Sequence, residues 1–343
     1  MQLIEDRCPG VLRLHVAADG CLARVRLPGG RITADGLRAI ADVAGLGNGL
    51  VELTSRASVQ IRGLRDGDRA AAADRLSEVG LLPSPSHERV RNIMASPLGG
   101  RDVTALLRTD ELVDALDRRL CALPRLAALP GRFLFAVDDG SGALRQDTGD
   151  VTLRAEADDA GEVALRLHLA GAPTTIAASP RAAAELALAA AHAFLTMLAE
   201  RPVTGSRPAW RIADLPAADV ERLARRLGGD MAHPPAGEPD DVEDSMRRHR
   251  HGTTMAPGVV EQVDGRRAVT ALVPLGRTAG ETIAALAELA DDEQGSVRFS
   301  PSRTVSVVDV VPSRASRVAA RLAGMGLVVD ADSGWHGLSA CAG

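Results

Sequence analysis

The feature that most constrains the fold of this chain is an internal repeat that occupies its two ends. Residues 10–83 and 256–330 carry the same succession of strand and helix patterns. Three pairs of turn residues recur at a constant offset of 246 positions: Pro28 and Pro274, Gly30 and Gly276, Gly80 and Gly326. Such a repeat indicates two copies of one supersecondary unit that bury their apolar faces together. Neither copy is expected to be stable alone, because its edge strands would stay unpaired.

Each copy is predicted to follow the order β-β-α-β-β-α, which places the chain in the α+β class with a pseudo-two-fold arrangement of the copies. Alternating apolar residues predict four strands in the first copy, over 11–16, 23–27, 50–53 and 59–61. Thr33 is the predicted N-cap of the first helix, and Gly80 is the predicted C-terminal cap of the second. We expect the turn at Arg56 to be echoed at Arg303, with one residue inserted.

The segment between the copies has a different pattern, typical of a mixed α/β domain over residues 84–227. It is predicted to contain strands over 89–94, 132–137, 151–154 and 163–169, a helix capped by Thr109 and a helix over 179–200. Residues 228–255 are rich in Pro, Gly, His and charge, which indicates a linker. The predicted domain order is therefore 1–83, 84–227, the linker 228–255, 256–330 and a short last segment, 331–343.

Composition excludes several classes of protein. The formal net charge is −5, and no basic block is present, so a nucleic-acid partner is not expected. The longest apolar run, residues 182–197, is interrupted by Glu185 and His192. It is also shorter than the ~20 apolar residues that a membrane-spanning helix needs. The first residues contain no apolar leader, which indicates a cytoplasmic protein. Four scattered cysteines lack the spacing of a structural zinc site.

Several motifs together carry a resemblance to a known family. They are Cys8-Pro9-Gly10, the segments 27–30, 52–63, 87–98 and 129–133, and Asp138-Asp139-Gly140. The first three motifs resemble the ferredoxin-like half-domain of the nitrite/sulfite reductase superfamily. The others resemble the start of its tetrapyrrole- and cluster-binding domain, so segment 84–227 is identified as that domain. Within the superfamily, the chain is most similar to precorrin-3B synthase.

The resemblance implies an oxidoreductase, a monooxygenase of aerobic cobalamin biosynthesis that hydroxylates precorrin-3A and closes a lactone. It also implies a tetrapyrrole substrate, a 4Fe-4S cluster, a further iron or sirohaem, and an electron donor. Arg56 and Arg91 occupy matching motif positions and are the implied catalytic residues. The implied substrate-binding residues are Gln60, Arg62, Asn92, Arg132 and Arg303. Guanidinium groups suit such a substrate because they bind carboxylates through paired hydrogen bonds.

Some interpretations stay open at this stage. Asn92 either holds a ligand oxygen or satisfies a strand end. Arg132 matches the first of two lysines in sulfite reductases, whereas Leu134 stands at the second position. Leu134 therefore speaks against the alternative of a sirohaem-dependent nitrite or sulfite reductase. A further alternative is a non-catalytic tetrapyrrole-binding protein.

The cluster ligands depart from the family pattern. Segment 339–343 matches the opening of the first cysteine pair, so Cys341 is the implied metal ligand, and three further cysteines are missing from the pattern. The remaining three, Cys8, Cys21 and Cys121, are expected to be small apolar side chains that are buried or partly buried. Two explanations are open: a chain cut short inside a second cofactor domain, or a standalone protein that keeps the tetrapyrrole-facing scaffold without redox capacity. A second polypeptide that completes the cluster site is a further candidate partner.

Overall fold

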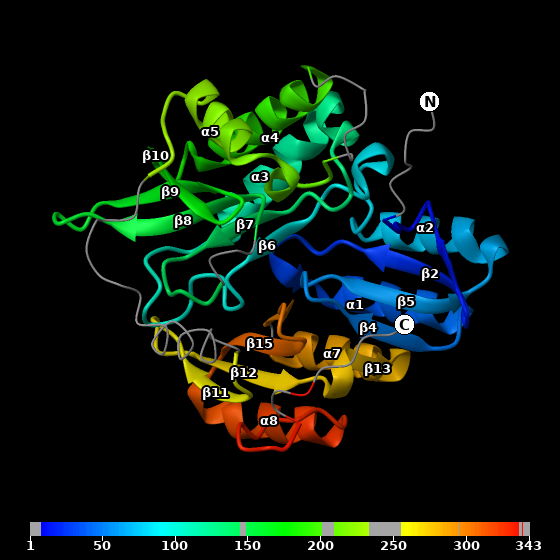
Figure 1. Ribbon diagram of the computed structural model, residues 1–343. Coiled ribbons are helices and arrows are strands. Elements are labelled where there is room, and N and C mark those ends of the chain that lie inside the picture. The colour runs from blue at the N-terminus through cyan, green and yellow to red at the C-terminus, as the bar shows by residue number, and fades with distance from the viewer. Residues whose placement is uncertain are drawn as a thin grey trace. The chain divides into compact units, whose positions relative to one another are not determined.

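The computed structural model describes residues 8–144, 149–200, 209–232, 255–293, 295–335 and 338 (Figure 1). The chain forms two compact units. The half-domain unit comprises residues 7–91, 101–103 and 255–343, and the central unit comprises residues 1–6, 92–100 and 104–254. The half-domain unit thus continues to Arg91, past the boundary predicted at residue 83. Most of the predicted linker 228–255 lies outside the described residues.

The half-domain unit contains the predicted order of elements twice, with one further short strand before the first helix of each copy. The first copy consists of β1 (His15–Ala17), β2 (Gly20–Val25), β3 (Arg31–Ile32), α1 (Ala34–Leu46), β4 (Leu50–Leu53), β5 (Val59–Leu64) and α2 (Arg69–Glu78). The second consists of β11 (Gly258–Glu261), β12 (Arg267–Leu272), β13 (Arg277–Ala279), α7 (Gly280–Glu293), β14 (Ser296–Phe299), β15 (Thr304–Val310) and α8 (Ala315–Gly324). The α+β fold with duplicated half-domains is therefore confirmed.

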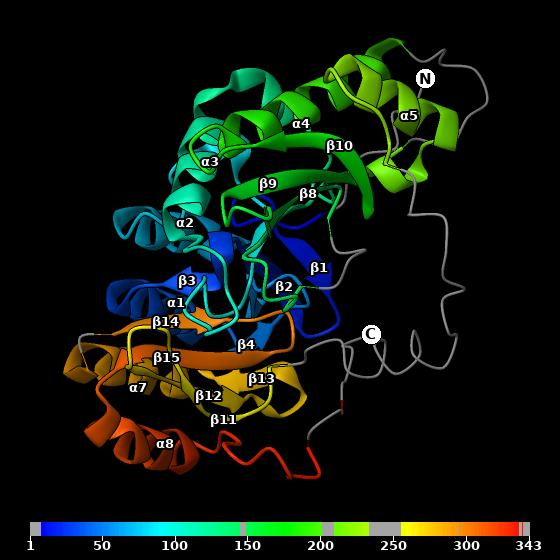
Figure 2. The ribbon, with the colours of Figure 1, turned by 90° about the vertical axis from the view of Figure 1, so that its left-hand side faces the viewer.

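The two copies exchange one short strand each. The sheet orders are β1-β2-β5-β4-β13 and β11-β12-β15-β14-β3, so β13 joins the first sheet and β3 joins the second. Figure 2 shows β3 beside β14. Arg277 lies opposite Glu52 in one sheet, and Arg31 lies opposite Arg298 in the other. The exchange covers an edge of each sheet, and this reciprocal pairing explains why the duplication forms one unit.

The backbone follows the repeat at a constant offset of 246, including positions with positive φ. These positions are Gly29 and Leu275, Gly30 and Gly276, Ala57 and Arg303, Gly63 and Asp309, Gly80 and Gly326. In the turns, Ala57 N donates to Thr54 O at 3.1 Å and Arg303 N donates to Ser300 O at 3.0 Å. Arg303 is therefore the counterpart of Ala57. The inserted residue that we expected, which would align Arg303 with Arg56, is wrong.

Helices α1 and α7 pack against each other and cover one face of both sheets. Thr33 caps α1 as predicted, because its hydroxyl accepts a hydrogen bond from Gly36 N at 3.1 Å. Leu37 and Ile40 of α1 are fully buried in the shared core. Burial of each such side chain stabilises the fold by about 1.5–3 kcal/mol. The strands alternate accordingly, with one set of side chains facing this core and the other set facing away.

The central unit is a five-stranded sheet with helices. Its strands are β6 (Ile93–Ala95), β7 (Phe135–Asp138), β8 (Val151–Ala157), β9 (Val163–Leu169) and β10 (Ala172–Ala178), and its helices are α3 (Asp110–Ala122), α4 (Ala183–Glu200) and α5 (Ala217–Arg226). The order is β10-β9-β8-β7-β6, with β6, β7 and β8 parallel. Thr109 stands at the start of α3, but its hydroxyl makes no capping hydrogen bond, so that predicted cap is wrong.

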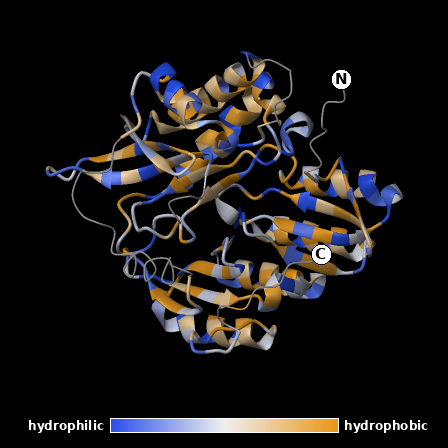
Figure 3. Ribbon diagram, viewed as in Figure 1, coloured by the Kyte–Doolittle hydropathy of each residue, from blue (hydrophilic) through white to orange (hydrophobic). Residues whose placement is uncertain are grey.

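Among the described helices, α4 has the length and composition of a membrane span. It is nonetheless built into the central unit, where it contacts α3 and β8. Phe194 is fully buried on α4, and its ring lies 5.3 Å from that of Phe133. Figure 3 shows the hydrophobic colouring along α4 and along the central strands. These contacts are those of a core helix, which is consistent with a soluble protein.

Candidate functional site

The sheet face of the first half-domain that points away from the helices is polar. In β2, Ala23 and Val25 face the core, so Arg24 and the following Arg26 lie on the opposite face. Gln60 of β5 lies opposite Arg24 in the strand register, and Glu52 of β4 lies opposite Gln60. Alternation of β2 and β5 therefore builds a continuous polar surface on three neighbouring strands.

Part of this surface is an internal network of ion pairs. Arg62 donates from Nε and Nη2 to Asp19 at 2.8 and 2.7 Å, and from Nη1 to Glu52 at 3.2 Å. These acids raise the pKa of Arg62, with the hydrogen bond to Asp19 as the largest cause. Gln60 accepts a hydrogen bond from Arg24 and donates to Glu52 at 3.2 Å. Arg62 and Gln60 both form hydrogen bonds to side chains of the same half-domain. The substrate-binding roles implied for them stay predictions.

Three arginines, Arg24, Arg26 and Arg56, form what we call the cationic cluster. Arg26 is 2% exposed, and burial, followed by the charge of Arg24 and with a smaller contribution from Arg56, lowers its pKa to about 9. Burial also lowers the pKa of Arg24. Arg56 lies half-buried in the turn after β4. Concentrated positive charge of this kind favours an anionic ligand.

Two of the family motifs meet beside the cationic cluster. Arg26 donates to Pro9 O at 2.8 Å and to Arg89 O at 3.3 Å, which joins segments far apart in the sequence. Glu88 accepts hydrogen bonds from the backbone nitrogens of Val11 and Leu12, at 2.7 and 3.0 Å. The buried Arg91 donates to Leu81 O at 3.1 Å. Arg91 lies in the same unit as Arg56, and its guanidinium is held by the carbonyl of Leu81.

The second half-domain has uncharged residues at the positions equivalent to the cationic cluster. At the offset of 246, the counterparts of Arg24, Arg26 and Arg56 are Thr270, Leu272 and Ser302. In place of the pair of Arg24 and Gln60, Thr270 and Ser306 share a hydrogen bond between their hydroxyls at 2.8 Å. The cationic cluster is therefore a property of one copy. The substrate-binding role of Arg303, in the second copy, stays a prediction.

The remaining implied site residues lie in the central unit. Asn92 donates from its amide nitrogen to Gly131 O at 2.9 Å and to Phe133 O at 3.1 Å, so it supports the turn that carries the exposed Arg132. These contacts support the interpretation in which Asn92 satisfies backbone groups at a strand end. Leu134 is buried in a small apolar cluster, where a second cation would be unfavourable.

The central sheet also carries a buried polar group that sequence reasoning missed. We call the side chains of Asp138, Thr152, Arg154 and His168 the central polar set. Of six buried side-chain atoms without a hydrogen bond among the described residues, four belong to this set. Thr152 lies opposite His168, and Asp138 lies opposite Arg154, so all four share one sheet face. Burial raises the pKa of Asp138 and lowers that of His168.

Within the described residues, no group of three or more His, Cys, Asp or Glu side chains could hold a metal ion. Cys8, Cys21 and Cys121 are partly exposed, on a loop, on β2 and on α3. These residues therefore do not fit a 4Fe-4S cluster, which needs converging cysteine thiolates. Cys341 lies outside the described residues.

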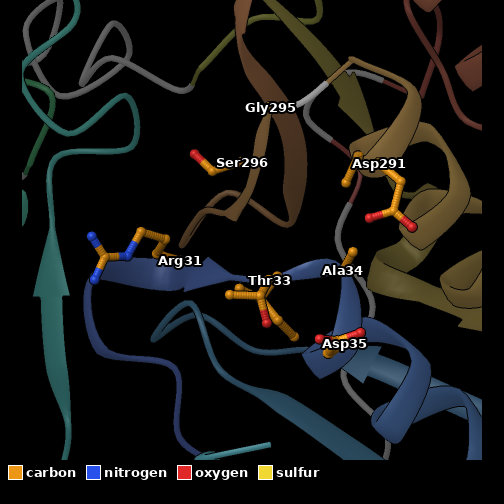
Figure 4. A pocket seen from close by; sticks show the side chains of 9 residues that line it. Arg31, Thr33, Ala34, Asp35, Asp291, Gly295 and Ser296 are labelled. Atoms are coloured by element: carbon orange, nitrogen blue, oxygen red, sulfur yellow. The ribbon is translucent and has the colours of Figure 1, made fainter.

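A pocket of about 420 Å³ lies at the seam between the two half-domains, where β3 meets β14 (Figure 4). Asp35 and Asp291 line one side, and Arg38 bridges them as an ion pair. The Arg31 guanidinium points away from both acids. The acidic and basic groups do not converge on one point, so this pocket lacks the uniform charge of the cationic cluster.

A duplicated α+β unit with exchanged strands and arginines on one sheet face defines the class of this protein. Residues 15–79 and 260–325 match the family described as the Nitrite/Sulfite reductase ferredoxin-like half domain. These two matched segments coincide with the two copies in the structure. These two segments of the chain therefore match the half domain of the nitrite/sulfite reductase family.

Similar proteins include enzymes of two kinds. The ferredoxin–nitrite reductase of Synechococcus elongatus is 26% identical over 318 residues, which cover 88% of this chain and 61% of the relative. A precorrin-3B synthase of Sinorhizobium is 30% identical over 230 residues, which cover 64% of this chain and 46% of the relative. The structure of the Mycobacterium tuberculosis NirA protein matches with a TM-score of 0.74 and 21% identity, covering 94% of this chain and 59% of that one.

These coverages bear on the expected function. The chain spans about three fifths of the nitrite reductase and less than half of the precorrin-3B synthase. The match to the nitrite reductase also covers more of this chain than the match to precorrin-3B synthase. The half-domain family that we expected is thus confirmed for residues 15–79 and 260–325, whereas precorrin-3B synthase is a weaker match than nitrite reductase.

Proposed function

We propose that the protein is an oxidoreductase of the nitrite/sulfite reductase type, in which the first half-domain binds the carboxylates of a tetrapyrrole. One observation carries the proposal. The cationic cluster is present in one copy and is replaced by Thr270, Leu272 and Ser302 in the other, so the backbone path that the two copies share does not require it. Three guanidinium groups gathered on one sheet face favour a ligand of opposite charge, and carboxylates suit them because of their paired acceptor oxygens.

In this proposal, Arg24 and Arg56 hold the ligand by charge-assisted hydrogen bonds, each worth roughly 1.5–3 kcal/mol. Gln60 and Glu52 orient Arg24, because Gln60 bridges the two side chains. Arg91 supplies a further fixed cation at the junction of the two motifs. Sirohaem, when bound, would supply the iron at which an oxyanion is reduced. An electron donor is expected because the similar nitrite reductase is named as a reductase that uses ferredoxin. A cytoplasmic location stays the expectation from the sequence.

A second candidate, a precorrin-3B synthase-like monooxygenase, is favoured by Leu134. The side chain is 3% exposed and packs with Met94 and Ala136, so this position contributes no cation to an oxyanion site. Loss of that cation removes part of the charge that a nitrite or sulfite reductase would use. A non-catalytic tetrapyrrole-binding protein would share the cationic cluster but would carry out no reaction.

The test is a titration with uroporphyrin, a porphyrin with carboxylates on every pyrrole ring, followed by protein and porphyrin fluorescence. We expect saturable binding that Arg24→Gln or Arg56→Gln weakens about tenfold, equivalent to the loss of about 1.4 kcal/mol. The matched control is Arg321→Gln on α8, which should leave the affinity unchanged. A cationic porphyrin should not bind.

Binding that is insensitive to both substitutions, or equal binding of the cationic porphyrin, would contradict the proposal. The choice between the two enzymes needs the pigment itself. Protein purified from a sirohaem-producing host should carry sirohaem absorbance if it is of the reductase type. Uptake of a precorrin, with oxygen-dependent conversion, would support the monooxygenase instead.

A further inference from the structure

Arg26 is the most buried member of the cationic cluster, and its counterpart in the second half-domain is Leu272. The two residues are 2% and 9% exposed at equivalent positions. Burial of a guanidinium costs several kcal/mol unless hydrogen bonds compensate it. An aliphatic side chain fills the same place in the second copy, so packing alone does not explain Arg26.

The hydrogen bonds of Arg26 show what the guanidinium does. Nη1 donates to Pro9 O at 2.8 Å and to Arg24 O at 3.4 Å, and Nη2 donates to Arg89 O at 3.3 Å. The guanidinium of Arg26 therefore joins the segments around Pro9 and Arg89, a link that the aliphatic side chain of Leu272 cannot make.

Glu88 also binds the backbone of segment 9–12, through nitrogens where Arg26 binds a carbonyl. Its Oε2 accepts from the nitrogens of Val11 and Leu12, while Arg26 donates to the carbonyl of Pro9. A Cβ on Gly10 would lie 2.4 Å from Glu88 Oε1, so any larger residue at position 10 would displace the Glu88 carboxylate from this place. The charge of Glu88 also favours the charged form of Arg26. Segments 9–12 and 88–91 are thus clamped together by two side chains of opposite charge.

We propose that Arg26 is a positioning residue that clamps segments 9–12 and 88–91, and so sets the spacing of Arg24, Arg56 and Arg91 around the ligand. This inference rests on the proposed function. Arg26 itself binds protein carbonyls and does not contact the ligand. The Cys8-Pro9-Gly10 motif is then a structural partner of the cations, because its carbonyl and Gly10 receive the clamp.

The test compares Arg26→Leu, which copies the second half-domain, with Arg26→Lys. We expect uroporphyrin affinity to fall at least tenfold in Arg26→Leu and by less in Arg26→Lys, which keeps the charge and one donor nitrogen. The dependence of binding on salt should stay as in the wild type for Arg26→Leu, because no ligand contact is lost. In Arg56→Gln, the affinity for uroporphyrin should depend less steeply on salt, because one contact between opposite charges is lost. Arg321→Leu is the matched surface control, and unchanged affinity in Arg26→Leu would overturn the proposal.

Hydrogen exchange separates this inference from the proposed function. In Arg26→Leu, the amides of Val11 and Leu12 should exchange at least tenfold faster, whereas amides of β14 and β15 should not change. Unchanged exchange at Val11 and Leu12 overturns the positioning role, whatever the binding result. If exchange rises but the wild type fails to bind uroporphyrin, the clamp is supported and the proposed function fails.

Discussion

Asp309→Asn should destabilise the half-domain unit by about 3 kcal/mol, because Asp309 holds a buried arginine. Arg101 donates from Nε and Nη2 to the two carboxylate oxygens at 2.8 and 2.9 Å. Its side chain is 5% exposed, and that of Asp309 is 22% exposed. Asn keeps the Oδ1 acceptor for Gln262 and tolerates the left-handed backbone at φ 64°, so the substitution removes the charge and replaces the Oδ2 acceptor of Arg101 Nη2 by a donor.

The magnitude follows from the burial of the pair. Removing one partner of a buried ion pair costs about 3–5 kcal/mol, and the partial exposure of Asp309 places the expected loss at the lower end. Urea unfolding followed by circular dichroism should show the midpoint falling by at least about 1 M, for a slope of about 1–3 kcal/mol per M. A double-mutant cycle with Arg101→Met isolates the pair. A loss under about 0.5 kcal/mol, or additivity of the two substitutions, would refute the reasoning.

Three further predictions concern single side chains. Thr152→Val should raise the free energy of unfolding by about 1 kcal/mol, because its buried hydroxyl has no hydrogen bond among the described residues; a lower urea midpoint would instead reveal a partner. His168→Gln should flatten the pH dependence of stability. Burial holds the His168 pKa below 6.5, so the wild type loses stability as pH falls below that value, by up to about 1.4 kcal/mol per pH unit, which urea titrations from pH 7.5 to 5 would measure. Gly63→Ala should cost at least about 2 kcal/mol in thermal unfolding, since φ is 72° and the new Cβ would lie 2.5 Å from Asn48 Cγ; an unchanged melting temperature would contradict this.

The order of elements in the half-domains was predictable because turn residues keep their spacing through the duplication. Gly30 and Gly80 adopt positive φ, as do their counterparts, so the chain keeps glycine or accepts strain there. The strand exchange was not predictable. Strand β3 contains two residues and β13 contains three, and each pairs only with the other copy. A strand stabilised by a distant partner carries no local pattern.

The candidate site was predictable only in part. Arg56 came from the motif that carries it, whereas Arg24 and Arg26 were overlooked within the alternating residues of β2. Alternation shows that these side chains leave the core, but it does not distinguish a solvent face from a ligand face. The burial of Arg26 and its bonds to Pro9 and Arg89 depend on segments far from β2 in the sequence. Only the folded chain brings those segments together.

The duplication supplies its own control for separating structure from function. Both copies keep the left-handed positions and the bulge at Gly63 and Asp309, since the backbone path of each sheet depends on them. They differ at positions where the backbone makes no demand, as at Arg26 and Leu272. A buried charge costs free energy that an aliphatic residue does not. Its retention in one copy therefore implies that the carbonyls around Arg26, and the ligand that the cationic cluster favours, together outweigh that cost.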